Sequence, residues 1–102
     1  VYTPTDNMIA AGMATVALVA EPAKLPVVCG EGGMTKLGGT ATYGISYYEL
    51  GKLTSTQAVS ILKSEKNPAE MPIEYLQKFD LIVNTNMVEA IGLTIPESLY
   101  NQ

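Results

Sequence analysis

Apolar positions along the chain alternate between short β-type runs and a stretch with helical spacing. Residues 1–3 form a brief β-leaning start, which Pro4 interrupts. An apolar stripe of helical period follows, at Ile9, Met13, Val16, Ala17 and Ala20. We expect one helix here, capped by Thr5, Asp6 or Asn7. It should end near Glu21, because Pro22 disfavours helical geometry in the residue before it.

The next two segments predict a second strand and a turn-rich loop. Residues 25–29 are compact and β-rich, with the length and composition of a strand buried on both faces. Two strands joined by a crossover helix of this length imply parallel pairing. Five glycines crowd residues 30–39, without the spacing of a dinucleotide or Walker A motif. Tight turns are the expected structure there, since the run does not open a clear helix.

The second half of the chain continues the alternation of strands and helices. Residues 41–45 predict a short strand, and the capping box Ser46–Glu49 predicts a helix that ends around residues 63–66. Two β-leaning runs come next, at residues 73–76 and 81–83. A last short helix should be capped by Asn84 or Asn86 and closed by Gly92. This order of elements favours an α/β fold with a mostly parallel sheet.

Composition narrows the possible functions. The 102 residues make one small domain or a piece of a larger one, and 47% hydrophobic against 16% charged residues implies a packed core. A net charge of −4 gives no reason to bind nucleic acid or an anionic membrane surface. The chain has no histidine and one cysteine, Cys29, which excludes Ser-His-Asp and Cys-His nucleophiles, a disulfide within the chain and a cysteine zinc cluster. We expect neither a metal nor a cofactor.

Polar residues follow the first two predicted strands. Thr5, Asp6 and Asn7 come after the first, and Glu31 comes after the second. Loops after consecutive parallel strands meet at one sheet edge, where ligands collect. Asp6 and Glu31 are therefore expected to face one cleft, with Asp6 accepting from a ligand ammonium group. The competing interpretations are that Asp6 only caps a helix and that Glu31 is a solvated loop acid.

Two further alternatives remain open at this level. The carboxylate pair Asp6 and Glu31 would suit a small acid–base enzyme, although no nucleophile accompanies it. The tyrosines of the middle region would either wall an apolar ligand or serve as ordinary packing residues: Tyr2, Tyr43, Tyr47 and Tyr48.

Several strings of this sequence resemble one family. They are PTDNMIA at 4–10, LPVVCGE at 25–31, GGTATYGISYYELGK at 38–52, MPIEYL at 71–76 and DLIVN at 80–84. Together they are similar to the substrate-binding proteins of ABC transporters, in particular those that take up tryptophan or tyrosine. The resemblance implies a Rossmann-like three-layer α/β lobe of the type I periplasmic-binding fold. It also implies that the chain is the C-terminal portion of a protein with two lobes.

The resemblance also suggests how the chain is divided. Residues 1–40 would belong to the second lobe, 41–72 would cross toward the first lobe, and 73–102 would supply the return strand and the terminal helix. A segment cut out in this way would expose surface that its missing N-terminal lobe normally covers, so a lone fragment is expected to dimerise or swap elements.

By the same resemblance, the function is solute capture and the ligand contacts are Thr5, Asp6, Asn7 and Glu31. A small amino-acid-like solute would close the lobes, and ABC permease subunits would receive it. The protein would be extracytoplasmic, periplasmic or lipid-anchored, and not an enzyme. A sensing or interaction module on the same fold, without transport, is the remaining alternative. The Gly32-Gly33 pair departs from the more usual acidic-then-glycine step, which would alter the pocket edge.

Overall fold

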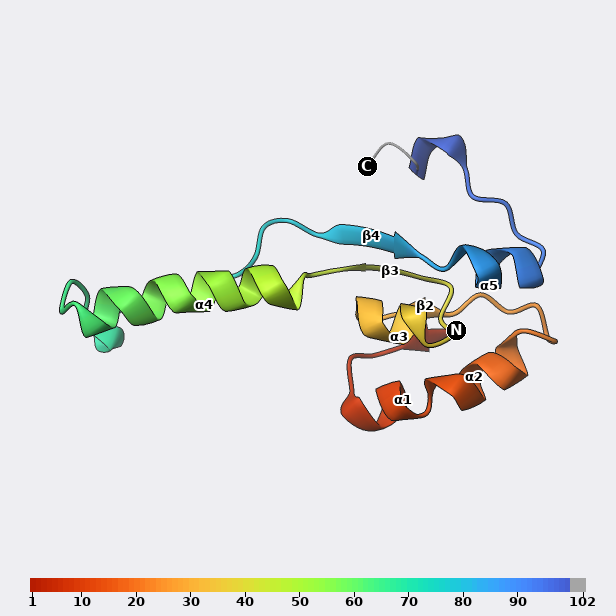
Figure 1. The fold of residues 1–102 in the computed structure, drawn as a ribbon, viewed down its shortest axis with the longest axis horizontal. Helices are drawn as coiled ribbons and strands as arrows, with labels where there is room; N and C mark the ends of the chain where they lie inside the picture. Colours follow the sequence, from red (N-terminus) through yellow and green to blue (C-terminus); the bar gives the residue numbers. More distant parts are fainter. Residues whose placement is uncertain (100–102) are drawn as a thin grey trace. The chain divides into compact units, whose positions relative to one another are not determined.

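The computed structural model describes residues 1–99, which fall into two compact units (Figure 1). The first unit joins Val1–Gly44 to the chain from Asp80 onward, and the second is Ile45–Phe79. No helix in this described stretch is long and apolar enough to cross a membrane.

A four-stranded sheet organises the first unit. Its strands are β1 (Tyr2–Thr3), β2 (Val28–Cys29), β3 (Ala41–Gly44) and β4 (Asp80–Val83), and they lie in the order β1-β2-β3-β4. β1, β2 and β3 run parallel, whereas β4 runs antiparallel to β3, with Ala41 opposite Val83 and Gly44 opposite Asp80 (Figure 1). The prediction of an α/β fold with a mostly parallel sheet is confirmed.

The predicted first helix is two helices. α1 (Asn7–Ala11) and α2 (Met13–Ala20) are separated at Gly12, whose amide donates to both the Ile9 carbonyl at 2.9 Å and the Met8 carbonyl at 3.1 Å. The shorter bond, three residues back, tightens the turn and ends α1. Glycine also has a low helix propensity, so the break falls where continuing the helix is least favoured.

The second strand is shorter and less buried than its composition predicts. Only Val28–Cys29 is strand, and its side chains alternate. Val27 and Cys29 are buried, whereas Val28 is half exposed. The expectation of a strand covered on both faces is therefore wrong for these residues, because one face alone packs on the core.

The glycine-rich stretch contains a helix, contrary to the expectation of turns alone. α3 (Gly32–Lys36) begins directly after Glu31, whose extended backbone and carboxylate form its N-cap. Met34 and Thr35 of this helix are fully buried. The cap and this burial offset the low helix propensity of Gly32 and Gly33.

In the second unit, α4 (Tyr47–Leu62) directly follows its N-cap residue Ser46, as predicted. The Ser46 hydroxyl accepts from the Glu49 amide at 3.4 Å, but the Glu49 carboxylate pairs with Lys52 at 3.0 Å. One half of the expected capping box is therefore present.

A short 3-10 turn, η1 (Pro68–Glu70), follows α4. The β-leaning run 73–76 forms no strand, because a strand needs a neighbour and none pairs with it in the described residues.

The last elements match their sequence signals. Asn84 caps α5 (Thr85–Ala90) by accepting from the Met87 amide at 3.2 Å. Gly92 follows with φ +77°, and the Leu93 amide donates to the Val88 carbonyl at 2.9 Å, which completes the predicted glycine-closed end. A second 3-10 turn, η2 (Glu97–Leu99), ends the described chain.

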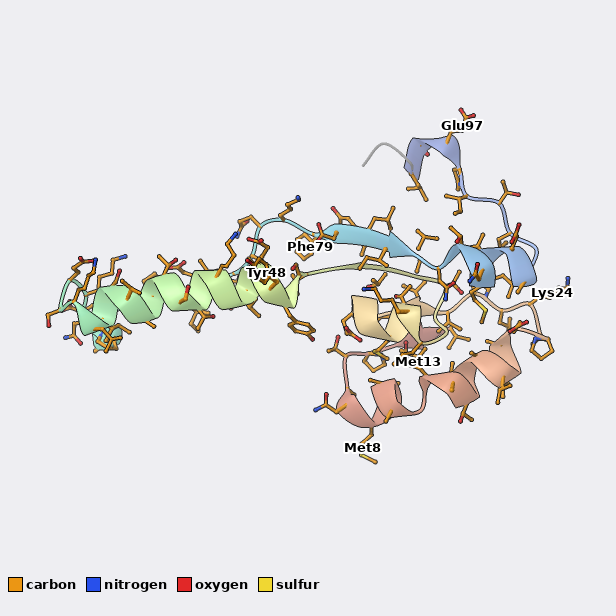
Figure 2. The ribbon with its side chains drawn as sticks, viewed as in Figure 1. Met8, Met13, Lys24, Tyr48, Phe79 and Glu97 are labelled. Atoms are coloured by element: carbon orange, nitrogen blue, oxygen red, sulfur yellow. The ribbon has the colours of Figure 1, made fainter. Side chains whose placement is uncertain are left out.

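One core joins α2, α3, α5 and the covered face of β2. In Figure 2 Met13 points inward from α2, whereas Met8 on α1 points into solvent. The buried members of this core are Met13, Ala20, Val27, Cys29, Met34, Met87 and Ile91. This packing anchors β2, and β1 is joined to it by strand pairing, so both strands present their following loops from one sheet.

Candidate functional site

The loops after β1 and β2 lie against each other. The Gly30 amide donates to the Thr3 carbonyl at 2.8 Å. A Cβ atom on Gly30 would collide with the Thr5 hydroxyl and lie 2.6 Å from the Thr5 amide nitrogen. Such a close approach is open only to glycine. The structure therefore brings the Thr5–Asn7 segment and the Gly30–Glu31 segment together at the carboxyl-terminal edge of the parallel strands, hereafter the rim.

Asp6 caps a helix at the rim. Its Oδ1 accepts from the Met8 amide at 2.8 Å and the Ile9 amide at 3.0 Å. Its other carboxylate oxygen accepts no hydrogen bond from residues 1–99, and the side chain is exposed, as are Thr5 and Asn7 beside it. Capping one helix with one oxygen leaves the second oxygen of Asp6 available to a ligand.

Glu31 is also a helix cap, not a solvated loop acid. Its Oε2 accepts from the Gly33 amide at 2.7 Å, and its Oε1 accepts from the Met34 amide at 2.6 Å. The residue is partly buried. Because both oxygens face the start of α3, Glu31 has fewer free acceptor positions than Asp6 and contributes mainly negative charge to the rim.

Asp80 is a third acid at the rim, and the sequence interpretation missed it. It begins β4 opposite Gly44, the last residue of β3. A Cβ on Gly44 would lie 3.4 Å from the Gly30 carbonyl oxygen and 3.9 Å from the Glu31 Cα, so this end of β3 adjoins the Glu31 loop. The sequence does not reveal that β4 runs antiparallel to β3. An antiparallel strand begins at the edge where its parallel neighbours end, so Asp80, the first residue of β4, lies at the rim.

The positive side chains of the first unit lie away from the rim. Lys36 is in the last turn of α3, which starts at the rim, and Lys24 follows α2 at the opposite end of the unit (Figure 2). The rim is therefore acidic and suits a cationic group. Its acids do not gather into a metal site: in residues 1–99 no three His, Cys, Asp or Glu side chains are placed to hold a metal ion.

The four tyrosines of the aromatic-rich region are not core residues in this chain. All four are more than half exposed: Tyr2, Tyr43, Tyr47 and Tyr48. Core packing is therefore wrong for these four residues within residues 1–99, whereas packing at the boundary of the core and the ligand-wall interpretation stay predictions.

The cap role of Glu31 predicts a loss of stability in the protein when its carboxylate is removed. Glu31→Ala leaves the Gly33 and Met34 amides without their acceptors and should lower the free energy of unfolding by about 0.5–2 kcal/mol. Glu31→Gln, which keeps one acceptor oxygen, should lose less. Urea denaturation measures both values, and Glu89→Ala, at an exposed position of α5, is the control. Equal stability of Glu31→Ala and Glu89→Ala would contradict the cap.

The sequence profile of the family described as ABC transporter substrate binding protein matches residues 1–102. The chain belongs to this family. A relative named tyrosine-binding protein, from Clostridioides difficile, is 32% identical over 92 residues, which cover 90% of this chain and 26% of the relative. The chain thus spans about a quarter of the length of that relative.

Solved substrate-binding structures agree with this assignment. The ligand-free, open structure of a substrate-binding protein with adhesive properties from Clostridium difficile has a TM-score of 0.75 and 36% identity, over 94% of this chain and 32% of that one. An ABC domain in complex with L-Trp from Streptococcus pneumonia has a TM-score of 0.83 and 31% identity, over 97% of this chain and 33% of that one. The fold of residues 1–99 is accordingly that of about one third of a substrate-binding protein.

Proposed function

We propose that the protein containing these residues captures a small amino-acid-like solute, aromatic in character, for an ABC importer. The observation that carries the proposal is the acidic rim, where Asp6 keeps one exposed oxygen free beside Thr5 and Asn7. Family membership and relatives whose names mention tyrosine and L-Trp support the choice of solute.

Each rim residue has a role in this proposal. Asp6 accepts from the solute ammonium group, and Glu31 adds negative charge beside it. Thr5 offers a hydroxyl, and Asn7 offers both a donor and an acceptor. Because the lysines of this unit lie away from the rim, the carboxylate of an amino acid would be bound by groups outside the first unit.

The same proposal covers partners and location. Residues 41–72 would cross toward the other lobe and residues 73–102 would return from it. Binding would shift the protein toward a closed state because the solute has higher affinity for that state. ABC permease subunits would then receive the solute. Substrate-binding proteins of this kind generally work outside the cytoplasm, and we propose a lipid anchor for this one.

The acid–base enzyme is the weaker alternative. Both carboxylates act as helix caps, and the relatives are named as binding proteins. Neither observation favours catalysis over solute capture.

Tyrosine analogues test the proposal on the whole protein. L-tyrosine or L-tryptophan should raise the unfolding midpoint, since a ligand that binds the native state stabilises it. Tyramine, which keeps the amine and lacks the carboxylate, should retain the contact with Asp6, whereas the deamino analogue of tyrosine should lose it. A midpoint that no amino acid or common metabolite moves would count against solute capture. If the deamino analogue raised the unfolding midpoint as much as tyrosine does, the rim would not be the place where the ammonium group binds.

A further inference from the structure

A cavity of about 640 Å³ lies in the first unit, toward the edge of the sheet opposite the rim. Residues of α2, α3, β4 and α5 line it (Figure 1). β4 ends at this edge, where its last residue Val83 is opposite Ala41, the first residue of β3. Small-molecule sites have volumes of roughly 300–1,000 Å³, so the cavity has the size of a ligand site.

Hydrogen bonds of one side chain hold two walls of this cavity together. The Asn84 Nδ2 donates to the Thr35 carbonyl of α3 at 3.1 Å, and the Asn84 Oδ1 accepts from the Met87 amide of α5 at 3.2 Å. All three residues line the cavity, and Met87 also belongs to the buried core. The cavity is therefore part of the packed structure, as small-molecule sites usually are.

Two residues of opposite charge line the cavity without pairing. Glu21 is the C-cap residue of α2, and Lys36 is in the last turn of α3. Within residues 1–99 neither side chain makes an ion pair or a hydrogen bond, to the other or to a third residue. Each charge is thus available to a ligand in the same cavity.

The position of Glu21 is unfavourable in the chain by itself. A carboxylate at the C-terminal end of a helix lies against the negative end of the helix dipole, and the last turn of α2 has no basic residue. Lys24, three residues further on, does not pair with it either. A bound cationic group would offset this repulsion. Residues that break a local rule in this way are expected at functional positions.

We propose that this cavity is a second ligand site, which binds a small zwitterion with its ammonium group at Glu21 and its carboxylate at Lys36. A cation or an anion alone would leave one of the two charges unmatched. Thr85 and Asn86, both exposed, add hydrogen-bonding groups, and Ile82 adds apolar surface. The site is separate from the rim and does not depend on the proposed solute capture.

An NMR titration of the whole protein tests the site. Glycine, β-alanine and γ-aminobutyrate carry both charges at increasing separation, whereas butylamine and butyrate carry one charge each. At least one zwitterion should shift the amide signals of Lys36 and Asn86 in the millimolar range and bind about threefold or more tightly than either single-charge compound, since exposed ion pairs are weak. The shifts should persist in Asp6→Asn, which alters only the rim.

Three results of this titration would overturn the proposal. They are the absence of a shift with all three zwitterions, equal binding of butylamine or butyrate, and loss of the shifts in Asp6→Asn. Because the signals report on residues of the cavity, each result is distinct from failure of the solute screen.

Substitutions test the two charges. Glu21→Gln and Lys36→Gln should each weaken binding of the zwitterion about threefold to fivefold, and both positions are exposed, so the fold should be kept. Glu89→Gln on α5 and Lys63→Gln at the end of α4 are the exposed controls outside the cavity lining and should bind normally. Binding by both cavity variants at the level of the controls would overturn the proposal. Weaker binding in Glu21→Gln alone would indicate a simple cation site and would overturn it as well.

Discussion

Gly30→Ala should weaken solute binding at least about tenfold and lower the free energy of unfolding by about 1–3 kcal/mol. The new methyl group would overlap the Thr5 hydroxyl and lie 2.6 Å from the Thr5 amide nitrogen. Backbone cannot rotate out of the way as a long side chain can, so the Thr5–Asn7 segment must shift. Isothermal titration calorimetry gives the affinity, and urea denaturation gives the stability.

Gly51→Ala is the matched control for this change. Gly51 lies within α4, and a Cβ there has nothing within 4 Å. Alanine is the better helix former, so this variant should be more stable by about 0.5–1 kcal/mol and should bind solute normally. If Gly30→Ala bound solute as tightly as Gly51→Ala does, the packing of the two rim loops would have no part in recognition.

Asp6→Asn should weaken the binding of an amino acid roughly tenfold while leaving the unfolding midpoint of the ligand-free protein almost unchanged. Asparagine caps helices about as well as aspartate, so the bonds to the Met8 and Ile9 amides are kept. What is lost is the negative charge. A hydrogen bond to a charged group contributes about 1–1.5 kcal/mol more than a neutral one, and about 1.4 kcal/mol corresponds to a tenfold loss of affinity.

Asp6→Ala separates the two roles of this residue. It removes the cap as well as the charge and should cost about 0.5–2 kcal/mol of stability in addition to the loss of affinity. Calorimetric titration of both variants, with scanning calorimetry of each free protein, makes the comparison. If Asp6→Asn bound the amino acid with wild-type affinity, Asp6 would act only as a helix cap and would have no role in binding.

Local signals explain which elements the sequence predicted. The side chains of Ser46 and Asn84 mark the starts of α4 and α5, and Gly92 marks the close of the last turn after α5. Each of these residues acts on backbone groups within a few positions of itself, so its effect can be inferred without knowing the rest of the fold. Thr5, Asp6, Asn7 and Glu31 were placed at one edge because a parallel strand pair fixes where both of its loops emerge.

Non-local contacts explain what the sequence did not predict. α3 exists because burial of Met34 and the Glu31 cap outweigh two glycines, and that burial depends on residues far along the chain. The run 73–76 has strand composition, but pairing decides whether a strand forms. Asp80 was missed for the same reason, since its place at the rim follows from the direction of β4 and not from its own neighbours.

The register of β3 and β4 has a consequence for the path of the chain. Gly44 and Asp80 are directly opposite each other, so the polypeptide departs from the first unit and rejoins it across a single pair of residues. Opposite residues of an antiparallel pair have Cα atoms about 5 Å apart, a gap that a tight hairpin turn closes. The stretch Ile45–Phe79 is in this sense an insertion into a β-hairpin, which leaves the β3–β4 ladder and returns to it at a single residue pair.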